Sequence, residues 1–359
     1  MLVFNRNKIR KEVLEVIDHR YQIQMKGIQS FIGLEENQGI HLQDYFLRFA
    51  TLNKEFYERL KNGANSVKEL YKTYTYEDQV LLAKIFRYVG AFIAEDMLKK
   101  NPIPNNILVE SINLNGLNAD WNIYPGVESD SILLYFHGGG NVMLSSKTHR
   151  LLTIELAKAT KLKVLSVNYR LAPEHPFPAA LDDCFSSYNW LLEQGYDPKN
   201  IVIGGDSAGG NYTIALLLRL KEKKIALPVG AFAISPILDY TLSSKTMYEN
   251  RETDPILADS GIFWWDSAYL AGADPTNPLI SPIFGDLRDL PPILLQVSKI
   301  EMLYDHSTRF AKAAKKAGTH IILQEWDDMP HAWHGFNKEL PEAKEAIEKI
   351  GIFVKSLFV

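Results

Sequence analysis

From residue 131 onward, short apolar runs alternate with amphipathic segments, and this alternation constrains the fold more than any other feature of the sequence. The apolar runs are rich in Val, Ile and Leu, whereas the segments between them repeat apolar residues at helical spacing. Strands that are buried on both faces read as continuous apolar runs, and parallel strands need helical crossovers. The sequence therefore predicts an α/β fold with a mostly parallel central sheet and helices on both faces.

The predicted strands cover residues 107–116, 117–126, 131–136, 163–169, 200–205, 292–298 and 320–326. The predicted helices of this part cover residues 153–160, 179–195, 208–223, 261–272 and 307–318, with a closing helix through Ile350. The alternation stops at Ser235 and resumes near residue 287. Between these points the sequence is aromatic and irregular, which indicates an insertion.

The first 105 residues have a different pattern, with apolar residues at helical spacing throughout. Three amphipathic helices are predicted there, and their apolar positions are Val13, Val16, Ile17 and Tyr21 in the first, Leu42, Tyr45, Phe46, Phe49, Leu52 and Phe56 in the second, and Leu82, Ile85, Phe86, Val89 and Ile93 in the third. We expect residues 1–105 to contribute to a helical cap, residues 106–235 and 287–359 to form the α/β core, and residues 236–286 to form a cap insertion.

Charge, cysteine content and hydropathy exclude several classes of protein. The formal net charge of -4 gives no basic surface for nucleic acid. Cys184 is the single cysteine, so no intrachain disulfide can form. The start of the chain lacks the apolar core of a secretion signal, and no apolar run approaches the ~20 residues that span a bilayer. We expect a cytoplasmic protein with no transmembrane segment.

The segment Gly205-Asp206-Ser207-Ala208-Gly209 fits the G-x-S-x-G pattern between a predicted strand and a predicted helix. In that context the serine lies in a strained turn with its hydroxyl exposed, and the helix directs amide N–H groups toward it. The alternative is a phosphate-binding turn, but the G-x-G-x-x-G and G-x-x-x-x-G-K-[ST] patterns are both absent. The segment therefore predicts that Ser207 is a nucleophile.

A serine nucleophile needs a histidine base and a carboxylate that orients it. In this fold the chain order is serine, acid, histidine, each at the carboxyl end of a strand. The loop after residues 292–298 offers Glu301 and Asp305. The loop after residues 320–326 offers His331 and His334.

Three consecutive glycines, Gly138, Gly139 and Gly140, follow the predicted strand 131–136. Attack on an ester carbonyl creates an oxyanion, and backbone N–H groups can stabilise it where no side chain blocks the approach. We therefore expect these glycines and Ala208 to form an oxyanion hole. A flexible turn is the alternative for an isolated glycine triplet.

The motifs HGGG at 137–140, NYRLAPEHPFPAALDD at 168–183 and GDSAGG at 205–210 give the chain a family resemblance. It resembles the hormone-sensitive-lipase-like carboxylesterases of the α/β-hydrolase fold. The resemblance implies hydrolysis of short-acyl esters beneath a helical cap, with no cofactor and no metal. It also implies that Ser207 is the nucleophile, His331 the general base and Glu301 the orienting acid, whereas His137 helps to fix the glycine loop.

Two departures from the family pattern are visible. Many members have Asp-Pro-Leu where this chain has Glu301-Met302-Leu303, so Asp305 remains the second candidate for the acid. Its alternative role is to start or cap the next helix and to pair with Arg309. The N-terminal region is also longer than that of the compact members. The substrate-binding residues therefore stay unknown, and His334 is interpreted as a packing or solvent-facing residue.

The main hypothesis is a serine carboxylesterase whose partner is a small-molecule ester. A lactone hydrolase or a deacetylase would use the same residues. A receptor of the same fold is a third class, and the gibberellin receptors that resemble this family have lost the histidine, which this chain retains as His331. A homodimer is left open.

Overall fold

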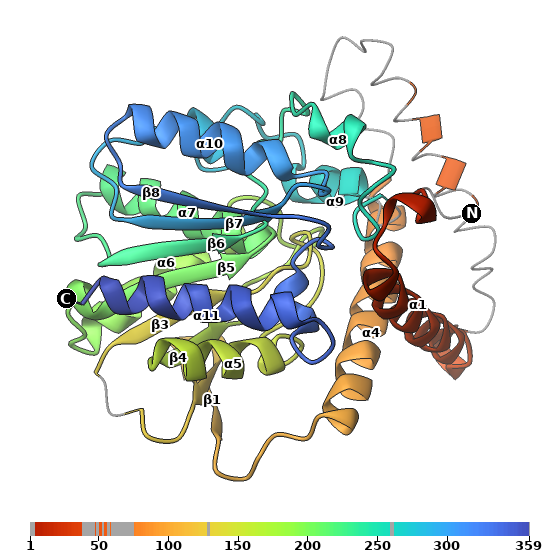
Figure 1. Cartoon of the computed structure of the whole chain (residues 1–359), viewed down its shortest axis with the longest axis horizontal. Coiled ribbons are helices and arrows are strands. Elements are labelled where there is room, and N and C mark those ends of the chain that lie inside the picture. Colours follow the sequence, from red (N-terminus) through yellow and green to blue (C-terminus); the bar gives the residue numbers. More distant parts are fainter. Residues whose placement is uncertain are drawn as a thin grey trace.

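The computed structural model describes residues 4–37, 75–127, 130–258 and 262–358, together with single positions 47, 50, 51, 54, 55 and 58. The helix predicted from Leu42 to Phe56 falls outside the described residues, because none of its apolar positions is among them. The other predicted elements can be compared with the structure. Figure 1 shows their arrangement.

One eight-stranded sheet forms the centre of the protein, in the order β1-β2-β4-β3-β5-β6-β7-β8 (Figure 1). Its strands are β1 (Leu108–Leu114), β2 (Leu117–Ile123), β3 (Ile132–Phe136), β4 (Lys163–Val167), β5 (Ile201–Asp206), β6 (Gly230–Ile234), β7 (Ile293–Ser298) and β8 (Ile321–Trp326). The strands from β4 to β8 in this order pair in parallel, whereas β1 and β2 form an antiparallel edge. The predicted mostly parallel sheet is confirmed.

The strand β6 was not predicted. Its sequence, Gly-Ala-Phe-Ala-Ile, contains small residues of low strand propensity. The strand forms because it lies between β5 and β7 and is completely buried there. Tertiary context thus overrides a weak local preference at this point.

Helices cover both faces of the sheet. One face packs against α5 (Arg150–Thr160) and α11 (Pro341–Ser356), and the other against α6 (Ala179–Glu193), α7 (Ala208–Glu222) and α10 (Tyr304–Lys316). The side chains of β3 alternate between these two faces. Leu133 and Tyr135 belong to the hydrophobic cluster on the face of α5 and α11, whereas Leu134 and Phe136 belong to the cluster on the face of α6, α7 and α10. The short 3-10 helices of the described residues are Arg6–Lys8, Glu35–Asn37, Pro198–Asn200, Pro282–Phe284 and Trp333–Phe336.

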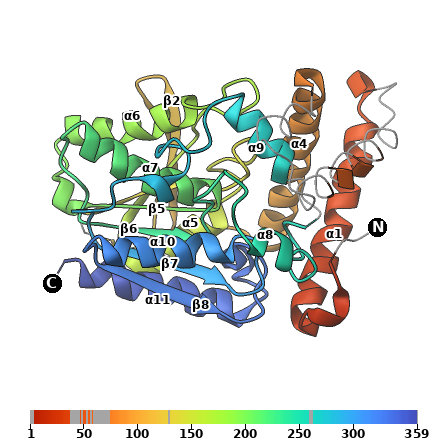
Figure 2. The same ribbon diagram turned by 90° about the horizontal axis from the view of Figure 1, so that it is seen from above.

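The N-terminal helices lie beside one end of this core. Figure 2 shows α1 (Lys11–Ile32) next to α4 (Tyr76–Lys100), and α4 next to α9 (Ile262–Leu270). Thr75 begins α4 with a capping box to Asp78. The helix α8 (Thr246–Glu249) belongs to the segment that precedes α9. Among the helices that the structure describes, none combines the length and the apolar character needed to cross a bilayer.

Side chains of α4 connect the N-terminal helices to the rest of the protein. The Phe86 ring lies 5.8 Å from that of Trp264 and 6.2 Å from that of Trp265, measured between centroids. Arg87 donates to the carbonyl oxygen of Val142 at 2.7 Å and pairs with the carboxylate of Glu174. The helix is therefore fixed both to α9 and to the loop that follows β3.

Candidate active site

Ser207 occupies the sharp turn between β5 and α7. Its backbone angles are φ 53° and ψ −116°, in a region that residues with side chains rarely adopt. The N–H of Ser207 donates to the carbonyl of Ile234 at 2.8 Å, which ties the turn to β6. A side chain at Gly209 would overlap the carbonyl oxygen of Phe136, so α7 can approach β3 because that position is glycine. The sequence pattern thus lies in the strained strand-to-helix turn that it requires.

Glu301 and His331 form a buried hydrogen-bonded pair. Nδ1 of His331 lies 2.7 Å from Oε2 of Glu301. Glu301 has no exposed surface, and His331 exposes 7% of its surface. Because a carboxylate oxygen accepts hydrogen bonds, Nδ1 carries the proton and Nε2 keeps its lone pair. The ring is therefore oriented as a base that accepts a proton at Nε2.

The second oxygen of Glu301 is also fixed. Oε1 accepts a hydrogen bond from the hydroxyl of Ser235 at 2.7 Å and another from the N–H of Ser298 at 2.9 Å. The Ser235 oxygen in turn accepts from the N–H of Ala332 at 3.2 Å. Ser235 thereby links the turn that carries Glu301 to the loop that carries His331.

Sequence reasoning missed Ser235. The residue follows β6, the strand that was not predicted, and it has φ 45°. The signal that could have found it is the Ser-Pro pair at 235–236, at the carboxyl end of a parallel strand. Functional side chains gather at such strand ends.

Asp305 makes different contacts from those of Glu301. Its carboxylate accepts from the hydroxyl of Ser244 and from the N–H of Lys245, the latter at 2.9 Å. The pair predicted between Asp305 and Arg309 is wrong, because Arg309 donates to Asp239 at 2.8 Å instead. Asp305 therefore anchors the start of α8 to α10.

Opposing effects determine the pKa of His331. Burial lowers it, whereas the hydrogen bond and the charge of Glu301 raise it, with smaller contributions from Asp254 and Asp206. The net pKa lies above the ordinary value of 6.5. The environment thus makes His331 a stronger base than a free imidazole.

Asp206, the residue before Ser207, holds the glycine loop. Its Oδ1 accepts from the hydroxyl of Tyr135 at 2.6 Å and from the N–H of Gly138 at 3.0 Å, and its Oδ2 lies 3.3 Å from Nε2 of His149. Burial acts to raise the pKa of Asp206, but the interactions with His149 and Tyr135 lower it to about 2. An ionised carboxylate is therefore buried directly beneath the loop.

The contact with Asp206 corrects the expectation for Gly138, whose N–H is already used within the protein. In the part of the chain that the structure describes, the N–H groups of Gly139, Gly140 and Ala208 donate to no protein acceptor. Gly139 has φ 122° and Gly140 has φ 57°, which favour glycine. The candidate oxyanion donors are therefore reduced to Gly139, Gly140 and Ala208.

Two further histidines, His137 and His334, lie outside the acid–base pair. The ring of His137 stacks on Tyr169 at 4.2 Å between centroids, and its Nδ1 lies 2.7 Å from the Gly138 carbonyl. His334 is buried, with its Nε2 2.6 Å from Oε1 of Gln296. Burial lowers the pKa of each ring to about 3, so both are neutral near pH 7. Their contacts are those of residues that support neighbouring loops.

A small cavity of about 10 Å³ lies beside Ser207. Its lining residues are Gly140, Asn141, Ser207, Ile237, Tyr240, Leu257, Ile262, Trp265, Asp266 and Leu303. Trp265 limits its size, because the indole ring lies so close to Gly140 that a side chain there would overlap it. Most of these side chains are apolar, which suits the acyl or alcohol part of an uncharged ester.

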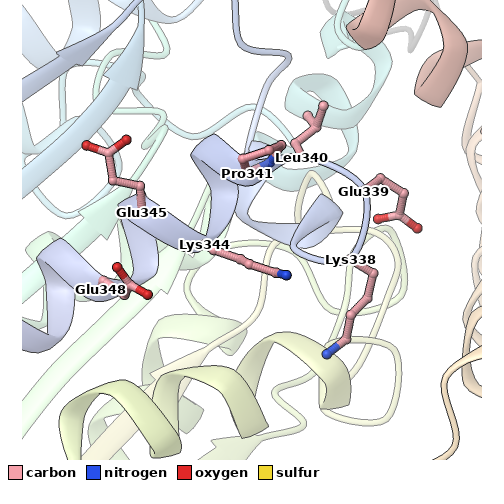
Figure 3. A pocket seen from close by; sticks show the side chains of 7 residues that line it. All are labelled: Lys338, Glu339, Leu340, Pro341, Lys344, Glu345 and Glu348. Carbon is pink, nitrogen blue, oxygen red and sulfur yellow. The ribbon is translucent and has the colours of Figure 1, made fainter.

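A larger depression of about 290 Å³ lies on the surface at the start of α11 (Figure 3). Its lining residues are Lys338, Glu339, Leu340, Pro341, Lys344, Glu345 and Glu348. They include no serine, threonine, cysteine or histidine, and Figure 3 shows several charged ends pointing away from one another. The smaller cavity, which Ser207 lines, is therefore the better candidate for the active site, despite the difference in volume.

Within the described residues, no group of three or more His, Cys, Asp or Glu side chains is arranged to hold a metal ion. In the described residues, Ser207 follows β5, the pair of Glu301 and His331 follows β7 and β8, and the unpaired backbone N–H groups follow β3 and β5. A family model described as the alpha/beta hydrolase fold matches residues 133–335. The chain belongs to this family.

Several relatives of this hydrolase are esterases by name. It is 39% identical over 238 residues to an acetyl-hydrolase of Streptomyces hygroscopicus, a match that covers 66% of this hydrolase and 79% of the relative. It is 36% identical over 266 residues to an esterase of Acinetobacter venetianus, covering 74% of this hydrolase and 88% of that protein.

A crystal structure of an esterase from the bacterial hormone-sensitive lipase family is also similar, with a TM-score of 0.73 and 36% identity. The match covers 86% of this hydrolase and 98% of that chain. The predicted resemblance is confirmed, and this hydrolase is a hormone-sensitive-lipase-like carboxylesterase of the α/β-hydrolase fold.

Proposed function

We propose that the protein hydrolyses short-chain acyl esters with Ser207 as nucleophile, His331 as general base and Glu301 as orienting acid. The observation that carries the proposal is the buried contact of 2.7 Å between His331 and Glu301, which leaves Nε2 as a proton acceptor. The strained turn at Ser207 supports the role of the serine.

In the acylation step, Nε2 of His331 takes the proton of the Ser207 hydroxyl while Oγ bonds to the ester carbonyl carbon. The protonated imidazole then donates to the ester oxygen, the carbon–oxygen bond breaks and the alcohol leaves. Water, deprotonated by the same nitrogen, attacks the acyl-enzyme, and the carboxylic acid departs as Ser207 regains its proton. The carboxylate of Glu301 stabilises the imidazolium that forms.

The N–H groups of Gly139, Gly140 and Ala208 are the proposed donors to the oxyanion. They come from the loop after β3 and from the first turn of α7, whose dipole also favours negative charge. Each such donor typically contributes about 3 to 4 kcal/mol to lowering the barrier. Asp206 supports this loop by accepting a hydrogen bond from the N–H of Gly138.

We also propose that residues 1–105 and 236–286 together form the cap over the site. Support comes from the contact of Phe86 with Trp264 and Trp265, which joins α4 to α9. Several cavity-lining side chains belong to the second segment, among them Tyr240 and Leu257. Most of the side chains that line the cavity are apolar, which favours an uncharged acyl group.

The decisive experiment is Ser207→Ala, assayed with p-nitrophenyl acetate and p-nitrophenyl butyrate. Turnover should fall by at least about 10⁴-fold while the circular dichroism spectrum stays unchanged. Ser356→Ala, at the end of α11, is the matched control and should keep full turnover. Unchanged turnover in Ser207→Ala would contradict the proposal.

A substrate panel then tests the acyl preference and the alternatives within the enzyme class. Acetyl to hexanoyl esters should be hydrolysed faster than palmitoyl esters. Lactones and acetylated sugars complete the panel, because a lactone hydrolase or a deacetylase would use the same residues. Fastest turnover of palmitoyl esters would refute the short-chain assignment.

A further inference from the structure

Asp254 is a buried carboxylate that the reaction described above does not use. It has no exposed surface and belongs to the segment that precedes α9. Its Oδ1 accepts from the N–H groups of Ile256 and Leu257, each at 2.9 Å. Its Oδ2 accepts from the N–H of Met302, also at 2.9 Å. One side chain thus joins two segments that are distant in the sequence.

Both segments carry parts of the active site. Leu257 lines the cavity beside Ser207. Met302 directly follows Glu301, whose carboxylate contacts His331. The bonds of Asp254 therefore connect a wall of the substrate cavity to the turn that presents the acid.

Neighbouring residues strengthen the same connection. The side-chain amide of Asn250 donates to the carbonyl oxygens of Lys299 and Glu301, each at 2.8 Å. The hydroxyl of Thr253 donates to the carbonyl of Ile300 at 3.0 Å. Residues 250–257 are thus hydrogen-bonded to every residue of the turn at 299–302. Asp254 is the carboxylate among the side chains that make these hydrogen bonds.

Asp254 interacts electrostatically with both members of the acid–base pair. Burial is the main cause that raises the pKa of Asp254 to about 6; Glu301 also raises it, whereas His331 lowers it. In turn, the charges that act on His331 are those of Glu301, Asp254 and Asp206. An ionised Asp254 therefore favours the protonated form of His331, and its removal should make His331 less basic.

We propose that Asp254 is a positioning residue that couples the cap segment to the acid–base pair, by holding the Met302 N–H and by placing a second carboxylate behind Glu301. This inference rests on the proposed esterase function. It predicts two separable effects, one on the geometry of the acid turn and one on the pH dependence of the reaction.

The first test compares Asp254→Asn with Asp239→Asn. Asp239 is a matched control, because it is also a buried carboxylate of the same insertion that accepts from its own loop, through the N–H of Thr241 and the hydroxyl of Ser243. The charges that act on His331 are those of Glu301, Asp254 and Asp206, and Asp239 is not among them. The measured quantity is the pH dependence of kcat/KM for p-nitrophenyl acetate, with active sites counted by fluorophosphonate labelling.

In Asp254→Asn, we expect the acid limb of the pH profile of kcat/KM to move to lower pH by about half a unit or more. In Asp239→Asn, the same limb should stay at its wild-type position. A loss of kcat should accompany the shift, by about tenfold to a hundredfold. An unmoved limb in Asp254→Asn, or equal shifts in both variants, would overturn the inference. An inactive wild-type protein would instead refute the proposed function itself.

The second test is Asp254→Glu, which keeps a carboxylate but displaces it by one methylene from the N–H of Met302. It also serves if Asp254→Asn does not fold. We expect a lower kcat with the acid limb of the pH profile in its wild-type position, because the charge is retained. A wild-type kcat in Asp254→Glu would overturn the positioning role.

Discussion

Nδ1 of His331 lies 2.7 Å from Oε2 of Glu301, and the same carboxylate is held at its other oxygen by Ser235 and Ser298. The acid is thus fixed by three partners before any substrate arrives. Such preorganisation costs no rearrangement during the reaction. Asp305 has other partners, so substitutions of the two carboxylates can show experimentally which one is the acid.

Glu301→Gln should lower kcat by about 10³- to 10⁴-fold, because the amide no longer holds His331 in the tautomer that accepts a proton at Nε2. Asp305→Asn is the matched control and should lose far less activity, since Asp305 contacts Ser244 and Lys245 rather than the imidazole. Steady-state kinetics with p-nitrophenyl butyrate checks both variants. A larger loss in Asp305→Asn would transfer the role of the acid to that residue.

The pH dependence of the wild-type enzyme follows from the raised pKa of His331. Below this pKa the ring is protonated at Nε2 and cannot accept the serine proton, so kcat/KM should rise with pH through one ionisation. The midpoint should lie above 6.5, because burial lowers the pKa of His331 by less than Glu301, Asp254 and Asp206 together raise it. A profile measured with an uncharged ester checks this, and a midpoint below 6.5 would contradict it.

Asp206→Asn should lower kcat by about tenfold to a hundredfold with little change in KM, because the carboxylate holds the N–H of Gly138 and thereby the proposed oxyanion loop. Asp120→Asn is the control, since Asp120 is a buried carboxylate of β2 that accepts from Ser146 and Arg150. Its kcat should stay at the wild-type value. Equal losses in both variants would indicate a general effect of removing a buried charge.

Trp265→Ala should shift the acyl preference toward longer chains, because it removes the ring that limits the cavity at Gly140. The ratio of kcat/KM for hexanoyl over acetyl esters should rise by about tenfold or more. Stability should fall by about 3 to 5 kcal/mol, as for other buried aromatic truncations. Trp326→Ala, which does not touch the cavity, should leave the ratio unchanged.

The sequence was sufficient to predict the sheet where strands are apolar and continuous, as in β3 and β5. It failed at β6, whose glycine and alanines carry no pattern and whose pairing depends on β5 and β7. The missing strand also concealed Ser235, since a residue at a strand end stands out only when the strand has been predicted. The division into core and cap at residues 106, 236 and 287 remains a prediction.

The candidate site shows the same dependence on local pattern. Ser207 and the glycine loop have motifs. The places after strands left two candidates each for the acid and the base, and the family resemblance then indicated Glu301 and His331. Neither the use of the Gly138 N–H by Asp206 nor the bonds of Asp254 to Met302 could be predicted, because each joins segments far apart in the chain. Such contacts depend on the packed structure and leave no periodic signal.

The order of the strands has a thermal consequence. β5, which leads to Ser207, lies between β3 and β6, whereas β8, which leads to His331, is the outermost strand on its side of the sheet. Peripheral elements open at a lower free energy than central ones. On warming, the protein should therefore lose its activity at a temperature where the circular dichroism signal is still nearly complete. The activity should return on cooling, because the molecules have not unfolded.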